Sequence, residues 1–444
     1  MKSPRTSYET WGAQILHVPN LGQEEIGSKK GADQIGIHRY RLRTNGIFGG
    51  TIILPQDLEA AAKELDEYHR GLGINDASEG RIISVNTEGR PFMHAFMEAL
   101  RENTQGIRSR IKEACEGGIL LPFIVSKECE EAADLLGLSI DTDAARAEMA
   151  NNKLIALSNL KEHGVKVPRQ IGFKNNQEAR EAYEKLKREG IHKMFAKANR
   201  GASGKGIYCI KSEADLEKFL ALEEAQETMR GNGFAMQEGI HYTHSPSAIF
   251  HIKEKLEDSI LIANGEQLLA KKNESDDVPT VHQGNSGRLS DALWEESGFK
   301  EGVEKTMAWL HEIGAYGHAG VDGLILRDED GNLDYRIIEI NFRLTGQSAG
   351  SMIGRDLEAD YFGSNNNIHV PEGMTMQDYI GHLESKNIHF DPNNQRGVYI
   401  VNHAPLEGRE PKIQIGIAAD SREELERMMT LAHPIGNQEL RRSA

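Results

Sequence analysis

Short apolar runs alternate with longer amphipathic stretches along the first third of the chain. The runs are short and bounded by turn residues, which is typical of buried strands, and they cover residues 14–18, 50–54, 81–85 and 119–125. Between them, apolar positions recur at helical spacing over residues 56–70, 91–114 and 129–136. Strands that alternate with helices predict an α/β unit with a partly parallel sheet over residues 1–140.

The middle of the chain begins with a helical pattern over residues 144–162, which ends at Gly164. A new unit starts at Pro168. Its pattern predicts helices over 176–188 and 213–227, and strands over 194–198, 206–210, 234–238, 248–252, 259–262 and 267–269. Residues 271–290 are polar and show no periodicity. A loop of that length inside a domain is usually functional or disordered, so it is a candidate lid.

The last third contains the strongest local signal. A helical pattern over residues 292–313 leads into two β-prone runs that flank Asp330-Gly331, and an Asp-Gly pair in this setting predicts a hairpin. If Asp330-Gly331 is a two-residue turn, Asp322 lies opposite Glu339 across the ladder. Residues 396–433 then predict two strands and a helix.

This register groups oxygen donors on one face of the hairpin. Glu339 and Asn341 are two residues apart, so they share a face with Asp322 opposite. Facing carboxylates are unfavourable unless a cation lies between them. Carboxylate and amide oxygens suit Mg²⁺, with Mn²⁺ as a substitute. Arg343, two residues further on, adds a cation for phosphate or carboxylate oxygens.

The alternative is an ordinary solvated face of a hairpin. That interpretation explains the acidic turn at residues 328–330 well. It explains Glu339 and Asn341 poorly, because they interrupt an otherwise apolar strand.

A second segment is rich in small residues. The predicted strand that ends near Lys197 runs into a loop whose glycines could turn backbone N–H groups toward phosphate oxygens; the loop positions are Gly201, Ala202, Ser203, Gly204 and Gly206. It is not a Walker A motif, because Gly206 follows Lys205 where a Ser or Thr is required. An ordinary Gly-rich hairpin loop is the alternative.

Two further segments are weak by themselves. Lys153, in a helical pattern, would by default be one more surface lysine. A strand end at Gln237, Glu238, Gly239 and Ile240 could supply backbone hydrogen bonds and apolar contact to an adenine edge. An exposed strand end explains that segment equally well.

Composition narrows the possible partners. The 444 residues carry a formal net charge of −16, which disfavours nucleic acid and anionic membranes. The sequence has no apolar run near the ~20 residues of a membrane span, and its first 30 residues show no secretory pattern. Cys115, Cys129 and Cys209 form no CxxC pair. We therefore expect no membrane partner, no disulfide framework and a cytoplasmic location.

The order of these segments resembles the ATP-grasp superfamily. Two lysines, a small-residue loop, the Gln-Glu-Gly-Ile segment and the Glu-x-Asn-x-Arg strand follow one another as they do in those enzymes. The resemblance implies an α/β and α+β fold: a pre-ATP-grasp α/β domain at 1–140, a two-subdomain ATP-grasp domain at 141–390 with its lid at about 168–240, and a strand-strand-helix extension at 391–444. The size and the tail are similar to those of pheganomycin-type peptide ligases.

The resemblance also implies an activity. Most such enzymes are carboxylate–amine or carboxylate–thiol ligases. The resemblance implies that this chain is an ATP-dependent carboxylate–amine ligase that forms an amide or peptide bond through an acyl phosphate and releases ADP and phosphate. Lys153, Lys197, the 201–206 loop and residues 237–240 would bind ATP, and the Asp322, Glu339 and Asn341 oxygens would hold one or two Mg²⁺. Arg343 would steady the acyl phosphate or the attacking carboxylate, with Arg288 as a second candidate. An amino acid or peptide substrate is expected, and a homodimer is compatible with this interpretation.

Other activities stay open. The same cradle could transfer a phosphoryl group without ligation. A non-catalytic ATP-binding regulator is disfavoured, because all three metal-side residues are present. A base for the amine could come from His241, His244, His251 or His282, although polar loop histidines without a specific role are the simpler explanation.

Overall fold

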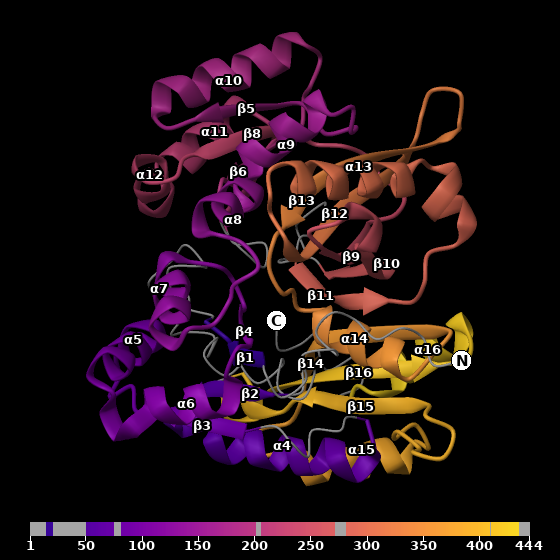
Figure 1. The fold of residues 1–444 in the computed structure, drawn as a ribbon. Helices are drawn as coiled ribbons and strands as arrows, with labels where there is room; N and C mark the ends of the chain where they lie inside the picture. Colours follow the sequence, from indigo (N-terminus) through magenta and orange to yellow (C-terminus); the bar gives the residue numbers. More distant parts are fainter. Residues whose placement is uncertain are drawn as a thin grey trace.

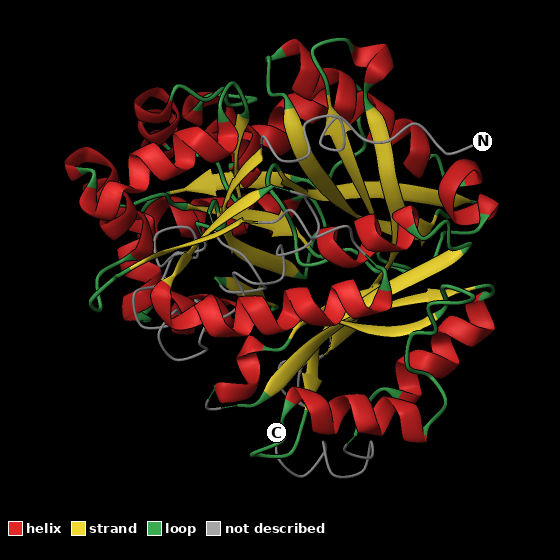
Figure 2. Ribbon diagram, turned by 60° about the horizontal axis from the view of Figure 1, so that its bottom comes forward, coloured by secondary structure: helices red, strands yellow, loops and turns green. Residues whose placement is uncertain are grey.

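The computed structural model describes residues 15–20, 50–74, 81–200, 206–270, 281–408 and 410–434. Its described strands form three sheets, with helices on their outer faces (Figures 1 and 2). This mixed α/β architecture agrees with the predicted fold class. None of the described helices is long and apolar enough to cross a membrane.

The N-terminal sheet is parallel throughout, in the order β3-β2-β1-β4. Its strands are β1 (Ile15–Val18), β2 (Thr51–Pro55), β3 (Arg81–Val85) and β4 (Ile119–Pro122). Its helices are α4 (Glu59–Leu72), α5 (Phe92–Glu102), α6 (Ile107–Cys115) and α7 (Lys127–Leu136), with single 3₁₀ turns at η3 (Gln56–Leu58) and η5 (Thr104–Gly106). The single helix predicted over 91–114 is wrong, because Asn103 ends α5 in the left-handed region at φ 53°.

The second sheet is antiparallel, in the order β5-β8-β6-β7. It contains β5 (Gln170–Phe173), β6 (Met194–Ala198), β7 (Ile207–Ile210) and β8 (Phe234–Glu238), with α10 (Asn176–Arg188), α11 (Glu213–Leu220) and α12 (Glu223–Arg230). Phe234 anchors its core, with ring centroids 5.6 Å from Phe173 and 5.1 Å from Phe219. The helix predicted over 213–227 is thus two helices.

The helical segment before this sheet is broken at Asn152, and the break fixes the position of Lys153. Residues 144–162 form α8 (Ala144–Asn151) and α9 (Lys153–Glu162) rather than one helix. Asn152 between them is extended, and its side chain accepts a hydrogen bond from the Ile155 N–H at 3.2 Å. This is an ordinary N-cap. Lys153 is therefore the first residue of α9, and it is buried.

The third sheet has eight described strands, in the order β13-β12-β9-β10-β11-β14-β16-β15, and its neighbours pair antiparallel. The strands are β9 (Pro246–Ile252), β10 (Ile260–Ala270), β11 (Val281–Ser286), β12 (Gly317–Arg327), β13 (Leu333–Asn341), β14 (Tyr361–His369), β15 (Gly397–Asn402) and β16 (Lys412–Ala419). The helical elements are η6 (Leu256–Asp258), η7 (Ala292–Glu296), α13 (Phe299–Glu312), α14 (Ser348–Asp356), α15 (Met376–Ser385), η8 (Ala404–Glu407) and α16 (Arg422–Leu431).

The tail of the chain continues this sheet. Strands β15 and β16 extend it beyond β14, and α4 of the N-terminal unit lies beside β15 (Figure 1). The His69 ring joins the two units through the Ile400 carbonyl at 2.6 Å. The predicted two strands and helix over 396–433 are confirmed as elements.

The predicted loop over 271–290 is wrong in its second half. Val281–Ser286 forms β11, between β10 and β14 in the large sheet. Its residues do not show the apolar pattern of a buried strand, because their polar side chains bond to one another and to other strands of the sheet, as Asn285 does to Ser247 on β9 at 2.7 Å. Residues 271–280 lie outside the described part of the chain.

Candidate functional site

The β12–β13 hairpin places Asp322 directly opposite Glu339 and Gly320 opposite Asn341. The predicted opposition is confirmed, but the predicted two-residue turn is wrong. The loop is wider, because the Asp328 N–H bonds to the Asn332 carbonyl at 2.9 Å. This shifts the register near the turn by one residue, and an irregularity between Asp322 and Gly323 shifts it back.

Neutral amides hold both oxygens of Asp322. Asn341 Nδ2 donates to Oδ2 at 2.9 Å, and Gln267 Nε2 donates to Oδ1 at 2.8 Å. Gln267 is held in turn by the Ser245 hydroxyl at 2.8 Å. Burial and then the Glu339 charge raise the pKa of Asp322 to about 7, against the opposing effect of Arg343.

Glu339 is surrounded by cations. Its Oε1 lies 2.9 Å from Lys153 Nζ. Burial favours the neutral acid, but Lys153, Lys197 and Arg343 outweigh burial, so the pKa of Glu339 is lowered. The two facing carboxylates therefore differ in their tendency to hold a proton.

Lys197 and Arg343 complete the charged group. Lys197, on β6, is 9% exposed; burial lowers its pKa to about 8, and the Glu339 charge opposes that shift. Arg343 Nη2 donates to Asn341 Oδ1 at 2.6 Å, and its guanidinium lies 5.9 Å from the Phe123 ring centroid. A helix start, a strand of the second sheet and a hairpin of the third thus bring three cations against two carboxylates.

The donor set fits a hard divalent cation and phosphate. Asp322, Glu339 and Asn341 offer only oxygen ligands, which Mg²⁺ prefers. In the described ranges there is no cluster of three or more His, Cys, Asp or Glu side chains that could hold a metal. A Mg²⁺ ion here would use the two carboxylates, the Asn341 oxygen and oxygens of a bound ligand. Lys153 would have to give up Glu339, and Arg343 would have to give up Asn341.

The small-residue loop is only partly described. Gly201, Ala202, Ser203 and Gly204 lie outside the described residues. Gly206 has φ 70°, and a Cβ there would lie 2.9 Å from the Ala198 Cβ. Its carbonyl accepts from the Ala198 N–H at 2.9 Å, so this glycine lets the chain return closely onto β6 just after Lys197.

The Gln-Glu-Gly-Ile segment lies at the end of β8, where Gln237 is buried. The Glu238 N–H bonds to the Arg169 carbonyl at 2.9 Å, and the Gly239 N–H bonds to the Lys193 carbonyl at 2.8 Å. These two N–H groups are therefore engaged inside the sheet. An adenine edge would have to use other groups of this segment, such as the Glu238 carbonyl or Ile240.

Two of the remaining candidates lie apart from the charged group. Arg288 is exposed on the segment that follows β11, and no described contact joins it to the hairpin residues. His251 is buried opposite His318, and burial lowers the pKa of His251 to about 3. A base with so low a pKa would take up protons poorly near neutral pH.

Sequence analysis missed a chain of neutral side chains beside the carboxylates. Ser247 lies opposite Asp322 on β9; it accepts from Asn285 at 2.7 Å and donates to Gln347 at 3.2 Å. The His282 ring lies 2.8 Å from Asn285 Oδ1. Strand pairing and the start of α14 bring these residues together, and no local sequence signal points to Ser247, Asn285 or Gln347.

Comparison with known proteins identifies a domain in the middle of the chain. Residues 150–347 match the model of the ATP-grasp domain family, and the chain carries such a domain. No curated protein matches the sequence.

Several solved structures share the fold over nearly the whole chain. N5-carboxyaminoimidazole synthase from Aspergillus clavatus, solved with ADP and 5-aminoimidazole ribonucleotide, aligns with 96% of this chain and 100% of its own at 14% identity and a TM-score of 0.57. Biotin carboxylase from Campylobacter jejuni aligns with 96% of this chain and 91% of its own at 12% identity and a TM-score of 0.58. The biotin carboxylase domain of Hydrogenobacter thermophilus 2-oxoglutarate carboxylase, solved with MgADP and bicarbonate, aligns with 94% and 89% at 16% identity and a TM-score of 0.58.

Proposed function

We propose that this chain, which carries an ATP-grasp domain, is an ATP-dependent carboxylate–amine ligase that forms an amide or peptide bond through an acyl phosphate. The observation that carries the proposal is the convergence of Lys153, Lys197 and Arg343 on the facing Asp322 and Glu339 carboxylates. Cations for phosphate and hard oxygens for Mg²⁺ are what phosphoryl transfer from ATP requires.

Each residue then has a role. Lys153 and Lys197 bind the ATP phosphates, and the Gly201–Gly206 loop closes over them. Asp322, Glu339 and Asn341 would hold one or two Mg²⁺ ions, for which Mn²⁺ could substitute, and bound there the ions would supply neutralisation of charge on the terminal phosphates. Arg343 binds the substrate carboxylate, and residues 237–240 lie on the adenine side.

The reaction has two steps. A carboxylate oxygen attacks the γ-phosphorus, the bond between this phosphorus and the β–γ bridging oxygen breaks, and ADP leaves. The amine nitrogen then attacks the acyl carbon, phosphate leaves with the carbon–oxygen electron pair, and the nitrogen loses a proton. Arg343 stabilises the negative oxygens in both steps. The closed loop keeps water from hydrolysing the acyl phosphate.

The neutral chain beside Asp322 supports a polar substrate. Ser247, Asn285 and Gln347 offer hydrogen bonds without a fixed charge, which suits an amino acid or peptide, as in pheganomycin-type ligases. The fold neighbours include a carboxylase domain solved with bicarbonate, so bicarbonate is the second carboxylate to consider.

We also infer an organisation from the three sheets: a pre-ATP-grasp domain at 1–140, the ATP-grasp domain at 141–390 with a lid at about 168–240, and an extension at 391–444. We further propose that the protein is cytoplasmic and forms a homodimer.

An ADP-release screen tests the function. The purified chain is incubated with MgATP, one carboxylate (an amino acid, a dipeptide or bicarbonate) and one amine. A ligase sustains ADP release over many turnovers only when both substrates are present, and mass spectrometry finds the amide. ADP release with a phosphorylated acceptor and no amide identifies a phosphotransferase. ATP binding without turnover for any pair identifies a regulator.

A further inference from the structure

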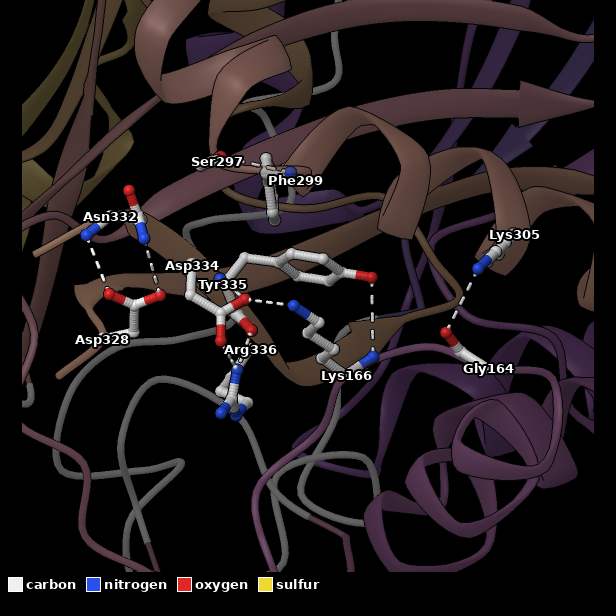
Figure 3. A network of polar contacts seen from close by, with 10 residues as sticks. All are labelled: Gly164, Lys166, Ser297, Phe299, Lys305, Asp328, Asn332, Asp334, Tyr335 and Arg336. Carbon is white, nitrogen blue, oxygen red and sulfur yellow. Dashed lines mark hydrogen bonds and ion pairs between the residues drawn. The ribbon is translucent and has the colours of Figure 1, made fainter. Parts of the chain in front are cut away.

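The strand that carries Glu339 and Asn341 is the outermost described strand of the large sheet. Its open edge is covered by residues 151–166. At one end the Ile337 N–H bonds to the Lys166 carbonyl at 2.9 Å, and Lys166 Nζ lies 2.6 Å from Asp334 (Figure 3). Such an edge needs partners for its backbone groups. The other end of the 151–166 segment lies at the candidate site.

At the end near the candidate site, the Asn151 side chain provides the hydrogen-bond partners for the edge backbone. Its Oδ1 accepts from the Phe342 N–H at 2.9 Å, and its Nδ2 donates to the Phe342 carbonyl at 3.0 Å. The same Nδ2 reaches the Ala147 carbonyl at 2.9 Å in its own helix. One side-chain amide thus replaces a neighbouring strand at a single residue of the edge.

Phe342 is the middle of a tight turn. The Arg343 N–H bonds to the Asn341 carbonyl at 2.9 Å, a hydrogen bond that spans three residues and closes a γ-turn. The turn aims Asn341 at Asp322 and lets Arg343 reach back to Asn341 Oδ1. A shift of Phe342 would move a metal-side oxygen and an anion-binding cation together.

The residues just after Asn151 reach the other parts of the site. Lys153 Nζ lies 2.9 Å from Glu339, and the Lys153 N–H donates to the Asn199 carbonyl at 3.1 Å at the root of the Gly-rich loop. Asn151 and Lys153 are separated by one residue, so the same short segment contacts the Phe342 turn and carries the candidate phosphate lysine.

We propose that Asn151 is a positioning residue for Mg-nucleotide binding: it holds the Phe342 turn, and with it Asn341 and Arg343, at a set distance from Lys153. The proposal rests on the nucleotide-binding part of the proposed function. It requires asparagine chemistry, because the Phe342 peptide groups need one donor and one acceptor side by side. Aspartate keeps only the acceptor, and alanine keeps neither.

The test compares ADP affinity with and without Mg²⁺ on the same protein. Isothermal titration calorimetry gives the dissociation constant of ADP in excess MgCl₂ and in EDTA, and the ratio reports the contribution of the metal. Partners that orient metal ligands are worth about 10–100-fold in metal affinity. Asn151→Ala should therefore lower the ratio by about tenfold or more, and leave the affinity in EDTA nearly unchanged because Lys153 and Lys197 remain.

Two further variants make the test decisive. Asn159→Ala is the matched control: Asn159 lies on α9, and its Nδ2 bonds to the Ile155 carbonyl at 2.9 Å, away from β13. Its ratio should equal that of the wild type. Asn151→Asp keeps the shape and the acceptor, but it replaces the donor with a charged oxygen that faces the Phe342 and Ala147 carbonyls. It decides the matter if Asn151→Ala does not fold, and it should also lower the ratio.

The proposal is overturned if folded Asn151 variants keep the wild-type ratio of ADP affinities with and without Mg²⁺. It is also overturned if the wild-type ADP affinity does not depend on Mg²⁺. An equal loss of affinity in EDTA and in MgCl₂ also overturns it, because that pattern is general damage to the site. The ligase proposal is judged separately: a chain that shows the Asn151 effect but releases no ADP with any carboxylate and amine keeps this inference and loses that one.

Discussion

Lys153 Nζ lies 2.9 Å from Glu339 Oε1, so the first residue of α9 and a residue of β13, far apart in the sequence, form one largely buried ion pair. A buried pair of this kind contributes little net stability, because desolvation offsets the attraction. It is suited to exchange instead. Under the proposed function, Lys153 would contact a nucleotide phosphate and Glu339 a metal ion, so neither charge would be left without a partner.

Changing Glu339 to Gln tests the metal role. Gln keeps the size and an oxygen acceptor for Lys153, but it removes one charge from the Mg²⁺ side. We expect ATP turnover to fall by about 10²–10³, or about 3–4 kcal/mol of transition-state stabilisation. Lys153 loses a charged partner, so the free energy of unfolding should fall by about 1–3 kcal/mol. Steady-state ADP release below the unfolding transition measures the first effect.

Asp334→Asn is the matched control for that variant. Asp334 lies on the same strand and also pairs with a lysine, Lys166 at 2.6 Å, but at the other end of β13 (Figure 3). Its loss should leave turnover unchanged. Equal turnover losses in both variants would mean that Glu339 acts only through the strand.

Lys197→Met should separate binding from stability. Burial lowers the pKa of Lys197 from 10.5 to about 8, so a protonated Lys197 at pH 7 costs the folded state free energy. Met keeps the apolar stem and removes the charge. We expect the free energy of unfolding to rise by roughly 1–3 kcal/mol while ADP affinity falls. Chemical denaturation and calorimetry measure the two effects. A destabilised variant would show that Lys197 is held mainly by its attraction to Glu339.

The same pKa predicts how ADP binding depends on pH. Lys197 is protonated below pH about 8 and loses its proton as the pH rises through that value. ADP affinity in EDTA should therefore be level just below pH 8 and fall above it, by at most about tenfold per pH unit for one required proton. Binding should also take up protons near pH 8, which calorimetry in two buffers of different ionisation enthalpy detects. The Lys197→Met profile should be flat, and a wild-type profile equally flat would contradict the assignment.

Gln267→Leu tests the support of Asp322. Gln267 Nε2 donates to Asp322 Oδ1 at 2.8 Å from a strand two positions away in the sheet. Leu removes that donor and leaves the carboxylate oxygen free to turn. The Mg²⁺ concentration for half-maximal ATP turnover should rise about tenfold. Gln226 on α12 donates to Asn176 on α10 at 2.8 Å, and Gln226→Leu should not change the Mg²⁺ concentration for half-maximal turnover. A Mg²⁺ requirement that stays at the wild-type value would remove Gln267 from the site.

The β12–β13 hairpin shows which features of a strand pair the sequence predicts and which it does not. The Asp-Gly pair and the apolar runs predicted that Asp322 faces Glu339, and it does. The turn itself is longer than predicted, and the register agrees only because a bulge at Asp322 compensates. Strand pairing follows the burial of one face, whereas turn length and bulges depend on local backbone energies that differ little between alternatives.

The helix break at Asn152 and the strand β11 show where the sequence fell short. The apolar positions of 144–162 continue through Asn152, so periodicity predicts one helix, but the cap and the Lys153–Glu339 pair favour two. The residues of β11 are polar, and their partners lie on strands far away in the chain. A pattern along the chain carries no information about such partners.

The sequence by itself determined the α/β class, the order of the charged segments and the face that Glu339 and Asn341 share, because periodicity and residue type are local properties. Tertiary structure decided that Lys153 and Lys197 meet Glu339, that Gln267 holds Asp322, and that Asn151 holds the Phe342 turn. Each of those contacts joins elements from separate parts of the chain. They form only when burial of the apolar faces packs α9 and the sheets together, and that packing is a property of the whole fold.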